Sequence, residues 1–207
     1  MAERIIIAID GPAASRKGTV AKKLAKIFNL PHLDSGQLYR YIAYQVMKSS
    51  IKPNNKSAVM ELTKKIKFDI SEIEDLRSDE ISTIASIISQ YSEIRDQLIE
   101  YQRNFASNGA VVDGRDIGTI IFPDADYKFY ITASLDQRTE RRYLQLGQDN
   151  SKIDRNKIKN DINMRDLRDI SRKIAPLKKA SDAIEIDTTE MKIDDVIDFI
   201  VKYIHKG

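Results

Sequence analysis

Apolar and polar positions alternate along the chain in a pattern that predicts an α/β fold. A continuous apolar run, "IIIAI" from Ile5 to Ile9, is typical of a strand that is covered on both faces. The later segments "GAVVDG", "YKFYITA" and "AIEID" predict further buried strands, with helical patterns between and after them. The last helical pattern carries one apolar stripe, formed by Ile193, Val196, Ile197, Ile200 and Ile204. We therefore expect a parallel central sheet with helices on both faces.

Two stretches interrupt this alternation. Residues 49–79 are polar and rich in lysine, with a helical pattern in "AVMELTKKI" and a segment, "KFDISEIEDL", that fits a strand and a turn. We interpret them as an insertion at the rim of the sheet. Residues 147–159 contain almost no apolar side chains, which is typical of a mobile loop or lid. The ranges 1–48, 80–146 and 160–207 would form the core of a single domain, because 207 residues suit one folding unit.

Composition excludes several classes of function. The 34 basic and 31 acidic side chains give a formal net charge of only +3, so we expect no general attraction to nucleic acid. The chain has no cysteine, and its two histidines, His32 and His205, are too few for a metal cluster, so we interpret each as a surface or loop residue. The run from Ile5 to Ile9 is too short for a signal-peptide core or a membrane span. We expect a cytoplasmic monomer without a membrane partner.

The stretch "DGPAASRKGT", from Asp10 to Thr19, joins the first apolar run to the first helical pattern. It nearly matches the pattern G-x-x-x-x-G-K, in which backbone N–H groups and the positive end of a helix face a phosphate. Lys17 could reach a β- or γ-phosphate as a point charge. A surface turn that ends in lysine is the alternative, but the context of strand, loop and helix favours a phosphate site.

The order of residues after Lys17 bears on the metal. Gly18 follows the lysine, and Thr19 comes one place later, so the hydroxyl group that usually binds Mg²⁺ is displaced. We expect Mg²⁺ to be held mainly by phosphates and water, and we assign no residue as a metal ligand.

Further segments occur in an order that resembles the bacterial cytidylate kinases, a family of nucleoside monophosphate kinases. They are "LDSGQLYR" from Leu33, "VVDGRDIGTIIFPDAD" from Val111, "RRYLQL" from Arg141 and "RDLRDISRKIAPLKKASDAIEIDT" from Arg165, and the loop "DGPAAS…KGT" is similar as well. The resemblance covers most of the chain, although the insertion looks shorter than in long members of the family and lacks a hairpin. It implies a three-layer P-loop kinase fold with a small nucleotide-binding insertion and a mobile lid. It also implies ATP- and Mg²⁺-dependent phosphorylation of CMP, and of dCMP.

The resemblance also implies the residues of each site. The donor site for ATP would comprise Gly11, Pro12, Ala13, Ala14, Ser15, Arg16, Lys17, Gly18 and Thr19. The acceptor site for CMP would comprise Ser35, Arg40, Ser86, Arg95, Arg115, Asp116, Arg165, Asp169 and Arg172. The catalytic residues would be Lys17, Arg115, Arg165 and Arg172.

The requirements of phosphoryl transfer agree with these assignments. The reaction depends on positioning the two nucleotides and on neutralising charge on the transferring group, and arginine is suited to that task. At the base, Asp116 could accept from the exocyclic amine of cytosine and Arg95 could donate to its O2 and N3 atoms. Ser86 could instead be a packed small residue. The arginines of residues 165–172 alone would fit a solvated helix with ion pairs, because aspartates are interleaved with them. The resemblance reverses that preference.

Arg16 stands in the place of the second glycine of the loop pattern. If position 16 has a positive φ, arginine costs roughly 1–3 kcal/mol of strain there. With helical dihedrals the backbone cost is small, and the Cβ atom would crowd the phosphate. Three interpretations stay open: a kinase with a weakened or altered donor site, which we prefer, a kinase in which Arg16 is harmless, and a nucleotide-binding relative with weak or no turnover. Within enzymes, the alternative is another small P-loop kinase that acts on AMP, UMP or a small metabolite.

Overall fold

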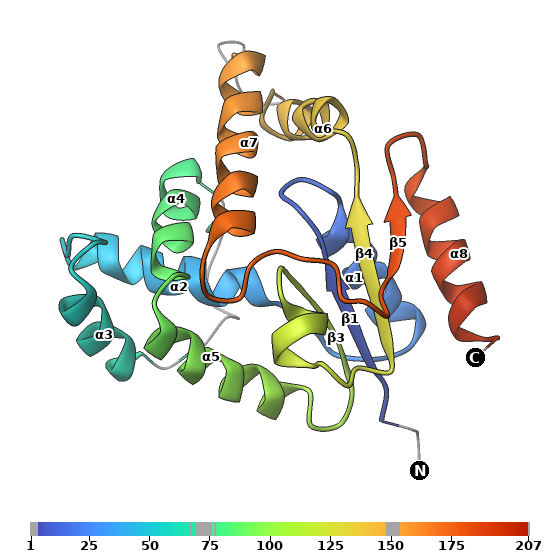
Figure 1. Cartoon of the computed structure of the whole chain (residues 1–207), viewed down its shortest axis with the longest axis horizontal. Helices are drawn as coiled ribbons and strands as arrows, with labels where there is room; N and C mark the ends of the chain where they lie inside the picture. Colours follow the sequence, from blue (N-terminus) through green and yellow to red (C-terminus); the bar gives the residue numbers. More distant parts are fainter. Residues whose placement is uncertain (1–3, 67, 69–75, 77, 148–153, 207) are drawn as a thin grey trace.

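Five strands form one parallel sheet in the order β2-β3-β1-β4-β5 in the computed structural model, which describes residues 4–66, 68, 76, 78–147 and 154–206 (Figure 1). The strands are β1 (Ile6–Asp10), β2 (His32–Asp34), β3 (Ala110–Gly114), β4 (Tyr127–Thr132) and β5 (Ile184–Asp187). The four predicted strands correspond to β1, β3, β4 and β5. Sequence analysis missed β2, because a three-residue strand with polar residues at both ends gives no apolar run.

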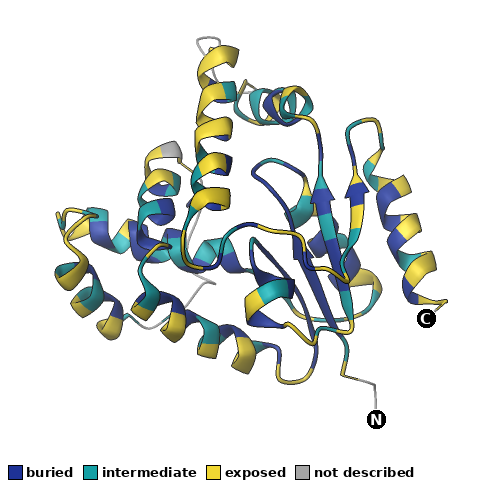
Figure 2. Cartoon of the chain, in the orientation of Figure 1, coloured by how far each residue is buried: buried dark blue, intermediate teal, exposed yellow. Residues whose placement is uncertain are grey.

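Side chains of the central strand β1 alternate between two cores, which explains why every position in it is buried. Ile7 and Ile9 pack toward α1 (Lys17–Ile27) and α8 (Ile193–Ile204) on one face. Ile6 and Ala8 pack on the other face, toward a π-helical turn, η1 (Ile117–Ile121), and the end of α5 (Ser92–Phe105). Figure 2 shows the resulting buried layer between exposed helix surfaces. The predicted parallel sheet with helices on both faces is thereby confirmed.

A second group of helices packs beside the β2 edge around a core of its own. It consists of α2 (Ser35–Lys48), α3 (Lys56–Lys65), α4 (Asp79–Ile88) and α5 (Figure 1). The predicted helical pattern "AVMELTKKI" corresponds to α3. Most of "KFDISEIEDL", and with it the expected absence of a hairpin, lies outside the described residues. The helical group also includes α2, which precedes residue 49, and α5, which follows residue 79.

Two helices, α6 (Leu135–Gly147) and α7 (Arg155–Ser171), stand above the carboxyl ends of the strands (Figure 1). Of the predicted loop at residues 147–159, residues 148–153 lie outside the described residues, and its last five residues, 155–159, belong to α7. The helix begins there because Asp154 caps it, accepting a hydrogen bond from the N–H of Asn156 at 2.8 Å. Among the described residues, none of the helices combines the length and the apolar character needed to span a membrane.

Candidate active site

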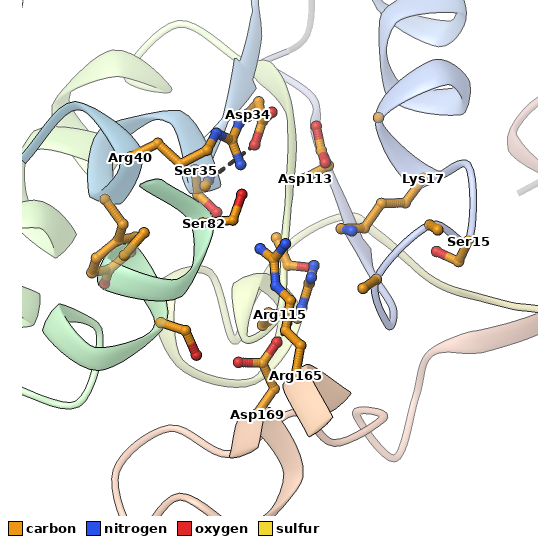
Figure 3. A pocket seen from close by; sticks show the side chains of 18 of the residues that line it. Ser15, Lys17, Asp34, Ser35, Arg40, Ser82, Asp113, Arg115, Arg165 and Asp169 are labelled. Atoms are coloured by element: carbon orange, nitrogen blue, oxygen red, sulfur yellow. Dashed lines mark hydrogen bonds and ion pairs between the residues drawn. The ribbon is translucent and has the colours of Figure 1, made fainter. Parts of the chain in front are cut away.

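The carboxyl ends of β1, β2 and β3 open into a cavity of about 1350 Å³ (Figure 3). That volume exceeds the range of about 300–1,000 Å³ typical of a pocket for one small ligand, so the cavity has room for two. All the predicted acceptor residues line it, and of the predicted loop residues only Gly11 and Pro12 do not. The structure therefore brings the two predicted sets of residues together.

Gly11 starts the phosphate loop at a point where the backbone passes close to β4. A Cβ atom at this position would lie 2.0 Å from the carbonyl oxygen of Ile131, so a side chain cannot be accommodated without moving the strand. The loop then turns into α1, whose first turn begins with N–H groups of Thr19 and Val20 donating to the carbonyl oxygen of Arg16 at 3.0 Å each.

Arg16 has φ 70 and ψ 8, in the left-handed region of the backbone. Of the two cases considered for position 16, a positive φ or helical dihedrals, the positive φ therefore applies. Arginine costs about 1–2 kcal/mol at this position relative to a residue that adopts this region freely. Its side chain is exposed. The guanidinium of Arg141 lies near enough to Arg16 for the two cations to repel. Burial is the main cause that lowers the pKa of Arg141 to about 10, and the charge of Arg16 is the next.

Lys17 points from the start of α1 toward the middle of the cavity (Figure 3). Its Nζ atom donates to the carbonyl oxygen of Pro12 at 3.3 Å. Burial, followed by the nearby charge of Arg115, lowers the pKa of Lys17 to about 7. An incoming phosphate would supply the negative charge that favours the ammonium form.

Three arginines, Arg40, Arg115 and Arg165, line the same cavity as Lys17. Arg40, on α2, pairs with Asp34 at 2.8 Å, and Arg115 pairs through Nε with Asp169 of α7 at 2.8 Å. Arg165 lies beside Arg115 (Figure 3), and burial, with Arg115 next, lowers its pKa to about 10. Within the described part of the chain, the buried Nε atoms of Arg40 and Arg165 have no hydrogen-bond partner. Unsatisfied buried donors beside clustered cations suit a bound anion.

Asp116 stands between two further arginines deeper in the cavity. Its Oδ2 atom pairs with Nη2 of Arg95, and its Oδ1 atom lies 3.6 Å from Nη2 of Arg172. Arg95 is also held by the carbonyl oxygen of Ser89 at 3.1 Å. The hydroxyl group of Ser86 is buried and has no hydrogen-bond partner among the described residues. A planar polar group could therefore be recognised here by an acceptor, two guanidinium groups and a hydroxyl.

Comparison with known proteins decides the family. A sequence model of the family described as cytidylate kinase matches residues 7–206. The chain belongs to the cytidylate kinase family. A cytidylate kinase of Bartonella tribocorum is 44% identical over 191 residues, which cover 91% of this chain and 89% of that protein. One of Clostridium tetani is 40% identical over 214 residues, covering 97% and 94%. The protein is thus an enzyme of the nucleoside monophosphate kinase class.

Solved structures support the fold alone. The shikimate kinase of Acinetobacter baumannii in complex with shikimate superimposes with a TM-score of 0.50 at 15% identity, covering 98% of this chain and 93% of that one. The expected three-layer kinase fold is therefore confirmed.

The interpretation of His32 as a surface or loop residue was wrong. His32 lies on β2, its side chain is only 16% exposed, and its Nε2 atom lies 2.8 Å from Oδ1 of Asp113 on the neighbouring strand. Burial, and then the charge of Asp34, raise the pKa of Asp113. Sequence analysis also missed Asp34, although an aspartate directly before "SGQLYR" is a recognisable helix cap, accepting from the N–H of Gly36 at 2.9 Å.

Asp10, the last residue of β1, is a further residue that sequence analysis did not assign. Its two carboxylate oxygens accept from the backbone N–H groups of Ile117 and Gly118 at 2.8 Å each. These groups follow Arg115 and Asp116 directly, so Asp10 fixes the segment that carries both. Burial raises the pKa of Asp10 to about 6.

The aspartates of α7 mostly reach other elements instead of pairing along their own helix. Asp169 pairs with Arg115 of the β3–η1 segment, and Asp166 pairs with Arg138 of α6. Within α7, only a distant contact of 3.9 Å joins Asp169 to Arg172 among the ion pairs of the described residues. Ion pairs within α7 are therefore few among the described residues, and Arg165, Arg168 and Arg172 line the cavity.

Proposed function

We propose that this protein transfers the γ-phosphoryl group of ATP to CMP, and also to dCMP, in the presence of Mg²⁺. The observation that carries the proposal is one cavity lined by Lys17 and by Arg40, Arg115 and Arg165, with Arg115 and Arg165 near enough for their charges to act on Lys17. An oxygen of the acceptor phosphate attacks the γ-phosphorus in line while the bond to the β-phosphate oxygen breaks, so ADP leaves and no covalent enzyme intermediate forms.

On the donor side, the N–H groups of the loop and of the first turn of α1 would bind the β-phosphate, and Lys17 would reach the β- and γ-phosphates. The described residues contain no group of three histidine or acidic side chains that could hold a metal ion. Mg²⁺ fits this site as a partner of the phosphates and water, with Thr19 displaced from the usual ligand position. When bound, it neutralises charge on the β- and γ-oxygens.

On the acceptor side, Arg40 and Arg115 would grip the phosphate of CMP, and Arg165 and Arg172 would neutralise charge on the transferring group. Ser35 and Asp169 would hold the ribose. Arg40, Arg115 and Arg172 each have a carboxylate partner in the structure, so these three cations are oriented before substrate arrives.

At the base, the Asp116 carboxylate would accept from the exocyclic amine of cytosine, and Arg95 would donate to O2 and N3. Ser86 has an unpartnered hydroxyl with which to join them. Uracil would present an oxygen to the carboxylate in place of the amine, which leaves two acceptors facing each other without a proton.

A coupled assay of ADP release with CMP, UMP, AMP and GMP as acceptors tests the proposal. We expect rapid turnover with CMP and none in the Lys17→Ala variant. Preferred turnover with UMP or AMP would identify another small P-loop kinase. Nucleotide binding by calorimetry without ADP release from any acceptor would identify a binding protein that lacks turnover.

A further inference from the structure

Side chains from α6 and α7 hold both backbone groups of Ala13, in the middle of the phosphate loop. Its N–H donates to Oδ1 of Asp166 at 2.9 Å, and its carbonyl oxygen accepts from Nη1 of Arg138 at 3.1 Å. The same guanidinium pairs with Oδ2 of Asp166 and donates through Nε to the carbonyl oxygen of Ala133 at 3.0 Å. Asp166 and Arg138 are both buried.

Apolar packing reinforces this joint. Ala13 forms a small core with Ile158 and Ile162 of α7, and Tyr143 and Leu146 of α6 pack against it. The phosphate loop and the two helices are therefore one packed unit at this point. Because interiors are close-packed, the loop cannot shift here without moving α7 or opening a void.

The neighbours of Asp166 on α7 belong to the acceptor end of the cavity. Arg165 precedes it, and Asp169, which pairs with Arg115, lies about 4.5 Å further along the helix axis. At the end of the helix, Arg172 approaches Asp116 and, at 3.5 Å, the hydroxyl group of Ser89. One rigid helix thus joins the donor loop at Asp166 to the acceptor residues on either side of it.

We propose that Asp166 is a positioning residue that couples the two nucleotide sites, so that a phosphate loop shaped for ATP also places Arg165 and Asp169 for CMP. The inference rests on the proposed function. Asp166 does not line the cavity and acts only through Ala13 and α7. Since coupling between two binding sites is reciprocal, each nucleotide should tighten the binding of the other by the same factor.

Calorimetry measures this factor without turnover. The dissociation constant of CMP is determined with and without a non-hydrolysable ATP analogue, and that of the analogue with and without CMP. For the unaltered protein we expect roughly fivefold tighter binding or more, within the usual range of such couplings. In Asp166→Asn the ratio should fall close to one, because one amide cannot serve both Ala13 and the buried cation of Arg138. The control Asp198→Asn, exposed on α8 and outside the cavity lining, should keep the full ratio.

A second variant, Arg138→Lys, covers the case in which Asp166→Asn does not fold. Lysine keeps the charge beside Asp166 but lacks the planar fork that also reaches the carbonyl oxygens of Ala13 and Ala133, so coupling should fall together with some loss of thermal stability. A purely structural ion pair would lower the melting temperature and leave the ratio of dissociation constants unchanged. That result, or the absence of coupling in the unaltered protein, would overturn the inference. Failure of CMP to bind or to be phosphorylated would instead refute the proposed function.

Discussion

Arg16→Gly tests how far the substituted phosphate loop limits this enzyme. The residue has φ 70 and ψ 8, which costs a non-glycine residue about 1–2 kcal/mol. Glycine removes that cost but increases the freedom of the unfolded chain, which costs about 0.4–1 kcal/mol. The free energy of unfolding should therefore rise by about 0.5–1 kcal/mol, which corresponds to a melting temperature higher by roughly 2 °C for a chain of this length.

The expected effect of Arg16→Gly on ATP binding and turnover has a different origin from its effect on stability. Backbone strain is present with and without ATP, so its relief appears mainly in stability. Crowding of a phosphate by the Cβ atom of Arg16 exists only when the phosphate is bound, so its relief appears in kcat/KM for ATP. We expect Arg16→Gly to bind ATP more tightly and to turn over faster by a few-fold, which is about 1 kcal/mol or less, without a change in nucleotide preference.

The assay is kcat/KM for ATP at saturating CMP, with thermal unfolding measured on the same preparations. Arg16→Ala keeps the Cβ atom and removes the cation, so it should not gain activity if crowding is the cause. Ala14→Gly relieves a second positive φ, of 58, and should raise stability while leaving the guanidinium in place. Lys17→Ala should abolish transfer with either residue at position 16. A slower glycine variant would show that Arg16 participates as a cation and that the loop is not weakened.

Three further outcomes are expected. The kcat/KM value should be on the order of a hundredfold higher with CMP than with UMP, a difference of a few kcal/mol, because uracil leaves the Asp116 carboxylate without a donor. Equal turnover of the two nucleotides would refute this role of Asp116. Arg172→Ala should lower kcat by at least about a hundredfold with little change in melting temperature, whereas lost stability with retained specific activity would make the residue structural. ATP binding at pH 8 should take up a proton at Lys17, because its pKa of about 7 in the free site rises beside phosphate. Calorimetry in two buffers should show less uptake at pH 6, where the lysine is already charged, and an unchanged value in Lys17→Ala at pH 8 would contradict the assignment.

The sheet and the phosphate loop could be predicted from the sequence because their signals are local. Buried parallel strands give continuous apolar runs, and the loop sits between a strand and a helix where its mechanism requires it. The acceptor residues came from resemblance to a family, since Ser86 and Arg95 have no local pattern that points to a base. The structure shows that they share one cavity with the loop.

Contacts between distant parts of the chain explain what was missed. His32 meets Asp113 across 81 positions, Asp10 meets Ile117 across 107, and Asp166 meets Ala13 across 153. A lone histidine or an aspartate among arginines looks like a surface residue until the partner is known. The φ angle at Arg16 could not be read from the residue type either, since arginine favours a negative φ and the surrounding loop imposes the positive one.

The strained backbone at Arg16 persists because its neighbours are fixed by other elements. Before it, β1 lies in the centre of the sheet, and Asp166 and Arg138 hold both backbone groups of Ala13. After it, the first turn of α1 forms on its own carbonyl oxygen. Since these contacts involve no atom of the Arg16 side chain, the path of the loop does not depend on glycine at this position. An arginine here should lower stability and crowd the donor while leaving the phosphate-binding N–H groups in place, which favours a working kinase with a weakened donor site over an inactive relative.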